Sequence, residues 1–180
     1  MAPPYEALSY VWGSQGNPEQ IFLNGHPYKI TQNLQQALLQ LRSPTEDRAT
    51  WIDALTINQS DLAERSVQVQ KMKIIYSMAT RVLVWLGLGD DNTLMAFKAV
   101  NSVNMVEQSS GILPQPPGSV MRSYLSEAFV DLIYLNYWDR VWIVQEIMYA
   151  KEAIILLGAT FRRVSIIRSV LEGLFEHRIR

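Results

Sequence analysis

The segment with the densest set of chemistry-bearing side chains spans residues 137–149 and reads YWDRVWIVQEIMY. Treated as one helix at about 100° per residue, it places Trp138, Trp142 and Glu146 on one face, with Gln145 beside them. Aromatic walls around a carboxylate and an amide are typical of a pocket for a planar, hydroxyl-bearing ligand such as a nucleoside or a sugar. The same spacing also fits an ordinary amphipathic helix, whose Trp rings pack under a loop and whose Glu146 is solvated.

A second carboxylate, Asp53, lies inside the apolar run WIDALTI of residues 51–57, which is typical of a buried strand. A buried carboxylate without partners costs several kcal/mol or has a raised pKa, so Asp53 is expected to have partners. One interpretation is a structural bond to a neighbouring loop or to an arginine such as Arg65 or Arg140. The other is a ligand-binding acid.

Polar side chains also follow this predicted strand. The sequence Asn58-Gln59-Ser60-Asp61 joins its carboxyl end to the start of a helical pattern. Free backbone N–H groups and the helix dipole at such a junction can receive an anion or a polar ligand. Most segments of this kind are ordinary helix caps, whose side chains bond to those N–H groups themselves.

Several kinds of chemistry are excluded by composition. The chain has no cysteine, which excludes disulfides, thiolate metal sites and a cysteine nucleophile, and its two histidines lie near opposite ends, so no metal site is predicted. A formal net charge of −1 provides no basic field for nucleic acid. No apolar run reaches the roughly 18–20 residues of a membrane span. The first residues lack the basic-then-apolar order of a signal peptide, so a cytoplasmic protein is expected.

The positions of these residues depend on the fold, which the sequence patterns indicate. The 180 residues suffice for one domain, spanning 1–180. Short apolar runs predict strands at 7–12, 51–57, 81–86 and 153–157, and helical spacing predicts helices at 31–42, 60–79, 92–108, 120–135, 137–149 and 164–177. Asn24-Gly25 predicts a hairpin over about 20–30, and the Pro- and Gly-rich stretch 109–119 predicts a flexible loop. Strands alternating with helices indicate an α/β fold with a mainly parallel sheet flanked by helices and an inserted hairpin near the N-terminus.

In such sheets, ligands bind in the crevice beyond the carboxyl ends of the strands. Here these ends are Trp12-Gly13, residues 57–59 and residues 87–91. We therefore expect Trp12, Gln59 and Glu146 to meet in one cleft at this edge.

Three stretches of the chain together resemble the heterokaryon-incompatibility (HET) domain of fungal proteins. They are ALSYVWG at 7–13; WIDA at 51–54, with Ile57-Asn58-Gln59, Asp61, Glu64 and Arg65; and RVWIVQE at 140–146. The likeness spans about residues 5–149. One departure is Thr56, where the family usually has cysteine, which suggests that the domain's activity needs no thiol.

The resemblance implies an effector domain that triggers programmed cell death when incompatible fungi fuse, attached to regulatory or sensor regions outside this chain. HET domains are distantly similar to TIR domains, which have a flavodoxin-like sheet and in several cases cleave NAD at the nicotinamide–ribose bond. Those enzymes use a glutamate on a helix that carries a Trp a few residues earlier. Trp142 and Glu146 fit that spacing.

Two functions follow from the resemblance. The first is an NAD glycohydrolase without metal or cofactor, in which a catalytic Glu146 binds the ribose hydroxyls and stabilises oxocarbenium-like charge. The second is a non-catalytic death-signalling module that forms homo-oligomers on activation, with a structural Glu146. The residues expected to bind an NAD-like nucleotide are Tyr10, Trp12, Gly13, Asp53, Asn58, Gln59, Arg140, Trp142 and Gln145.

Overall fold

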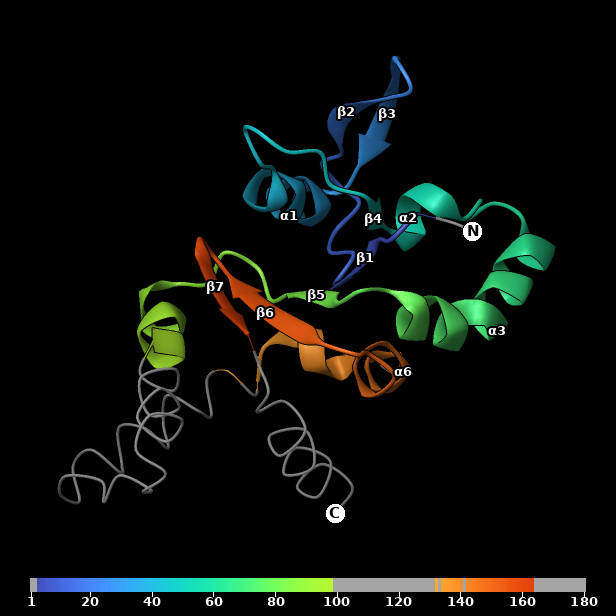
Figure 1. Cartoon of the computed structure of the whole chain (residues 1–180). Helices are drawn as coiled ribbons and strands as arrows, with labels where there is room; N and C mark the ends of the chain where they lie inside the picture. Colours follow the sequence, from blue (N-terminus) through green and yellow to red (C-terminus); the bar gives the residue numbers. More distant parts are fainter. Residues whose placement is uncertain (1–2, 99–131, 133, 141, 164–180) are drawn as a thin grey trace, which may run out of the picture.

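A five-stranded sheet organises the chain in the computed structural model, which describes residues 3–98, 132, 134–140 and 142–163 (Figure 1). The strands follow the order β4-β1-β5-β6-β7. The first four are parallel, and β7 pairs antiparallel with β6. This arrangement confirms the predicted α/β class and the mainly parallel sheet.

The strands of this sheet are short and the helices flank them. The strands are β1 (Glu6–Tyr10), β4 (Thr50–Trp51), β5 (Val82–Trp85), β6 (Ala153–Leu157) and β7 (Thr160–Arg163). The labelled helices are α1 (Gln32–Leu41), α2 (Asp53–Thr56), α3 (Leu62–Met78), the 3₁₀ helix η1 (Asn136–Asp139) and α6 (Ile143–Met148). Residues 91–98 are also helical.

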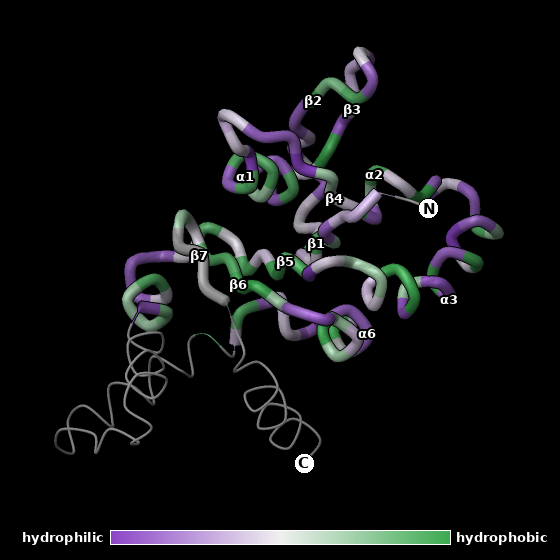
Figure 2. Tube along the Cα trace, viewed as in Figure 1, coloured by the Kyte–Doolittle hydropathy of each residue, from purple (hydrophilic) through white to green (hydrophobic). Residues whose placement is uncertain are grey.

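The two faces of the sheet bury different helices, because side chains alternate between the faces along each strand. Leu8 and Tyr10 of β1 lie in the cluster that includes Leu34 of α1. Ala7 lies in the opposite cluster, with Tyr76 of α3. Figure 1 shows α1 on one side of the sheet and α3 and α6 on the other, and the hydropathy colouring of Figure 2 is largely hydrophobic along β5 and β6. By the same alternation, Ser9 faces the α3 and α6 side.

The predicted hairpin is confirmed as β2 (Glu19–Leu23) and β3 (His26–Ile30), which form a separate antiparallel pair. Asn24 and Gly25 form the turn with φ of 53° and 80°, the left-handed conformation that these two residue types tolerate. The hairpin stands away from the main sheet in Figure 1. Only Ile30, its last residue, is buried.

The strand predicted over 51–57 is wrong beyond Trp51, so Asp53 does not lie in the middle of a strand. The chain turns into α2 at Asp53 instead. The Asp53 carboxylate accepts a bond from the N–H of Ala54 at 2.7 Å, and the Thr56 hydroxyl donates to the carbonyl of Ile52 at 2.8 Å. These local bonds compete with a strand ladder and favour the helical turn.

The single helix predicted over 137–149 is also wrong. The 3₁₀ helix η1 ends at Asp139, Arg140 is extended with φ −77° and ψ 127°, and α6 begins at Ile143. Since the helix is interrupted, the face arithmetic across it does not hold. The predicted loop 109–119, the helices 120–135 and 164–177 and the end of the helix 92–108 lie outside the described residues, apart from isolated positions near 132–135.

The predicted helices at 31–42 and 60–79 are confirmed, with their caps. Thr31 accepts a bond from the N–H of Leu34 at the start of α1, and Asp61 accepts from Ala63 and Glu64 at the start of α3.

In the part of the chain that is described, no helix combines the length and apolar character that crossing a membrane requires.

Asn33 provides a test of how α1 is fixed to the sheet. Its amide donates to the carbonyl of Val11 at 2.6 Å and accepts from the indole N–H of Trp85 at 2.9 Å. Trp85 is fully buried, so Asn33→Ala strands a buried donor and should lower the free energy of unfolding by about 2–3 kcal/mol. Urea unfolding measures this loss, and Gln32→Ala, one residue earlier and exposed, should change stability by less than about 0.5 kcal/mol. Equal effects of the two variants would contradict the assignment.

Candidate functional site

Glu146 is completely buried and forms an ion pair with Arg140. One guanidinium nitrogen of Arg140 donates to Oε1 of Glu146 at 2.7 Å and the other donates to Oε2 at 2.9 Å. The side chain of Glu146 is 0% exposed, and that of Arg140 is 18% exposed. Two parallel N–H···O bonds of this kind fix both partners in orientation. The extended backbone at Arg140 lets its side chain reach forward to α6.

Ser9 and Tyr137 complete this cluster from two other elements. The Ser9 hydroxyl donates to Oε2 of Glu146, and the Tyr137 hydroxyl is within hydrogen-bond distance of Ser9. Since Ser9 has one hydroxyl hydrogen and gives it to Glu146, Tyr137 donates to Ser9. Tyr137 and Ser9 are both buried. We call Ser9, Tyr137, Arg140 and Glu146 the internal brace.

The brace overturns the prediction that Glu146 lines an aromatic-walled face open to a ligand. Trp142 precedes α6 and is 41% exposed, and the indole of Trp138 donates to the carbonyl of Leu132 at 2.7 Å. Gln145 is half-buried on α6. Burial raises the pKa of Glu146, and its contacts with Arg140 and Ser9 oppose that rise. Glu146 is thus neither on a face open to a ligand nor solvated, and its pairing with Arg140 gives it a structural role.

Asp53 forms a second polar centre at the carboxyl ends of β1 and β4. Its Oδ2 accepts the indole N–H of Trp12 at 2.8 Å, and its Oδ1 accepts the N–H of Ala54. Tyr10, at the end of β1, lies close enough to this carboxylate to affect its pKa. Burial raises the pKa of Asp53, while the bonds from Trp12 and Ala54 and the charge of Arg140 oppose the rise. Asp53 thus has the structural partners that the sequence required, although none of them is Arg65.

Three predicted residues near this centre have different local roles. Gln59 bonds to the backbone of Asp53, whereas Asn58 and Gly13 shape the adjoining turns. The Gln59 amide donates to the carbonyl of Asp53 at 3.2 Å. The Asn58 side chain accepts from the N–H of Ser60 at 3.1 Å and acts as a local cap. Gly13 has φ of 75°, and a Cβ there would lie 3.4 Å from the side chain of Asn33. A glycine is therefore favoured where the chain turns out of β1.

The structure brings the predicted residues Tyr10, Trp12, Asp53 and Gln59 together, with the Arg140 charge near enough to act on Asp53. It does not bring Trp142 into this group. Glu146 is buried in the core and bonded to Arg140, so the described residues do not show the expected open cleft shared by Trp12, Gln59 and Glu146. Residues 87–91, which were expected at the ligand-binding edge, lead into a helix. Asp90 accepts from the N–H of Thr93 at 2.8 Å and caps the helix at 91–98.

Sequence reasoning missed Ser9, Tyr137 and Asn33. Ser9 carried a signal, since it is the one polar residue inside the apolar run ALSYVW. A polar residue at a fully buried strand position requires a hydrogen-bond partner. Tyr137 and Asn33 carried none, because their partners are more than 20 residues away in the chain.

The described residues hold no group of three or more His, Asp or Glu side chains that could bind a metal ion. The two polar centres are instead built from hydrogen bonds and one ion pair. Such an arrangement can orient aromatic rings and present a half-buried carboxylate and guanidinium at the carboxyl edge of the sheet.

The raised pKa of Asp53 predicts a pH effect on stability. An unfolded aspartate titrates near 3.8, so between this value and the raised folded value the folded protein binds more protons than the unfolded chain. The contribution of Asp53 to stability therefore increases as the pH falls through this window, and decreases as the pH rises. Urea unfolding of the wild type and of Asp53→Asn at about pH 7 and about pH 4 should show the wild type gaining relative to the variant at the lower pH. A constant difference between them would contradict the assignment.

Comparison with known proteins identifies the family of the chain. The family model for "Heterokaryon incompatibility protein (HET)" matches residues 5–146, which include both polar centres. "Heterokaryon incompatibility protein 6, OR allele" of Neurospora crassa is 27% identical over 228 residues, covering 97% of this chain and 33% of its own length. The chain thus spans about one third of the curated relative that it matches. No solved structure matches the chain. Since the family model covers most of the residues, the chain belongs to the heterokaryon incompatibility (HET) family.

Proposed function

We propose that this chain is the effector domain of a fungal heterokaryon-incompatibility protein and acts in programmed cell death. The support is its family membership and the similarity to a Neurospora crassa protein whose name refers to heterokaryon incompatibility. The match to one third of that relative fits a domain that works with regulatory or sensor regions elsewhere in a longer protein.

At the molecular level, the domain acts as a non-catalytic signalling module that works by homotypic assembly. The observation that carries this choice is the burial of Glu146, whose two oxygens are both bonded within the internal brace. A glutamate that stabilises an oxocarbenium-like transition state must contact the ribose. In the brace, both carboxylate oxygens are already bonded to Arg140 and Ser9, and the side chain is buried.

Helix α3 provides apolar surface for assembly. Val67, Ile74 and Met78 are 48%, 57% and 61% exposed. Their spacing of seven and then four residues places them on one side of the helix. Neighbouring apolar side chains exposed on a helix are a common feature of protein–protein interfaces.

NAD cleavage is the second candidate function, and one specific observation favours it. Trp12, Asp53 and Gln59 gather at the carboxyl edge of the sheet, where α/β folds bind nucleotides. The charge of Arg140 acts on Asp53, and the Arg140 side chain is partly exposed. For Glu146 to act in this reaction, Arg140 would have to exchange the glutamate for an anionic group of the ligand.

One experiment separates the two functions. We expect purified protein to self-associate with rising concentration in sedimentation velocity and to leave NAD intact at every concentration, because the carboxylate is sealed. Ile74→Lys should weaken the association, since it places a charge in the apolar surface of α3. The matched control is Ser66→Lys, exposed on the same helix but about 100° from Val67 around its axis, which adds the same charge outside that surface and should leave the association unchanged. NAD turnover that rises with assembly would overturn the non-catalytic assignment and establish the second function.

A further inference from the structure

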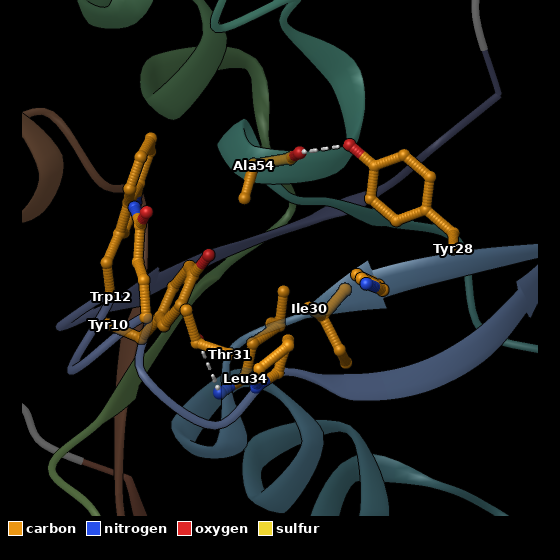
Figure 3. Close-up of a pocket in the computed structure, with 10 residues that line it drawn as sticks. Tyr10, Trp12, Tyr28, Ile30, Thr31, Leu34 and Ala54 are labelled. Carbon is orange, nitrogen blue, oxygen red and sulfur yellow. Dashed lines mark hydrogen bonds between the residues drawn. The ribbon is translucent and has the colours of Figure 1, made fainter.

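A cavity of about 250 Å³ opens between the β2–β3 hairpin, the end of β1 and α2, on the opposite face of the sheet from the internal brace. Its walls include the aromatic rings of Tyr10, Trp12 and Tyr28 and the aliphatic side chains of Ile30 and Leu34 (Figure 3). Among the residues that line it, Lys29 is the one charged side chain. The proposed signalling role uses none of these residues.

The walls of this cavity are held in place by bonds to the rest of the domain. The indole of Trp12 is fixed by its bond to Asp53 at 2.8 Å. The Tyr28 hydroxyl lies 3.4 Å from the carbonyl of Ala54, to which it donates, so the hairpin contacts α2 at this point (Figure 3). Ile30 and Leu34 are buried in the core. The cavity is therefore largely formed before any ligand enters, which reduces the ordering cost of binding.

The composition of the walls selects the ligand. Flat aromatic faces favour a planar ring by stacking, and the volume lies just below the usual range of about 300–1000 Å³ for ligand pockets, so it suits a ring system more than a large molecule. Lys29 lies between Tyr28 and Ile30 on β3, so its side chain starts from the other face of the hairpin. It is exposed, and its long flexible stem can bring the ammonium to an anionic group that extends from the cavity into solvent.

We infer that the cavity beneath the hairpin is a binding site for a small molecule that combines a planar aromatic ring with a phosphate or carboxylate group. The ring enters between Trp12 and Tyr28, and the anionic group remains at the mouth beside Lys29. Binding there joins the hairpin to α2 and to the end of β1. The walls are separate from α3 and from Glu146, so binding here requires neither self-association nor cleavage, although Trp12 is shared with the group that favours NAD cleavage.

Calorimetric titration of the whole chain with adenosine 5′-monophosphate tests the site, with adenosine and ribose 5-phosphate as the ring-only and anion-only probes. We expect the monophosphate to bind more tightly than adenosine, and ribose 5-phosphate to give no measurable heat. The NMR signal of the Trp12 indole N–H, assigned with Trp12→Phe, should shift on binding and so locate the ligand. No binding of the monophosphate up to about 5 mM, or equal affinity for adenosine, would overturn the inference.

Variants on the hairpin make the test specific. Tyr28→Ala removes one aromatic wall from a side chain that is 41% exposed, so the fold should persist while affinity falls about 5- to 10-fold. Lys29→Gln should weaken binding of the monophosphate about threefold at low salt and leave adenosine unaffected. Phe22→Ala, on the same hairpin, 74% exposed and outside the cavity, is the matched control and should bind as the wild type does. Identical affinities for Tyr28→Ala and Phe22→Ala would contradict the site.

Discussion

The buried ion pair between Arg140 and Glu146 is the interaction on which the positions of the surrounding elements depend. Removing two charges from water is costly, and the cost is offset only when every polar atom of the pair is bonded. Arg140 supplies two bonds, and the Ser9 hydroxyl supplies a third. The pair therefore requires β1, the segment after η1 and α6 to be present together.

This requirement explains how a helix as short as α6 is kept in place. Six residues form too few internal hydrogen bonds to be stable alone, so α6 depends on tertiary contacts. Ile143 and Ile147 bury its apolar side against the core, and Glu146 adds a directional bond from the same helix to the sheet. The chain between η1 and α6 must stay extended at Arg140 for its guanidinium to reach Glu146.

At the carboxyl edge of the sheet, buried polar groups are likewise held by hydrogen bonds. Asp53 follows β4, begins α2 and fixes the indole of Trp12. That indole then forms one wall of the cavity beneath the hairpin. Arg140 is bonded to Glu146, and its charge also opposes the rise in the pKa of Asp53.

Much of the fold could be predicted from the sequence, because its signals are local. Each of these signals is contained within a few consecutive residues. They are the apolar runs that form β1, β5 and β6, the Asn24-Gly25 turn, and the helix caps. The two errors had different causes. At Asp53 the chain turns into α2 through side-chain bonds to nearby backbone groups, which an apolar run does not reveal. The helical pattern of residues 137–149 is interrupted at Arg140, whose ion pair with Glu146 is completed by Ser9 of β1, and a single-segment pattern carries no information about that distant partner. The proximity of Trp12, Asp53 and Gln59 agrees with the expectation from the strand ends, whereas the burial of Glu146 was not expected.

The most direct test of this account is a double-mutant cycle of Arg140→Gln and Glu146→Gln, measured as free energies of unfolding in urea. If the pair is an internal brace, Glu146→Gln alone leaves Arg140 uncompensated and should cost about 3 kcal/mol, and the double variant should be more stable than the sum of the single effects by on the order of 2 kcal/mol. A coupling energy near zero, with Glu146→Gln as stable as the wild type, would contradict the account and leave Glu146 free for another role.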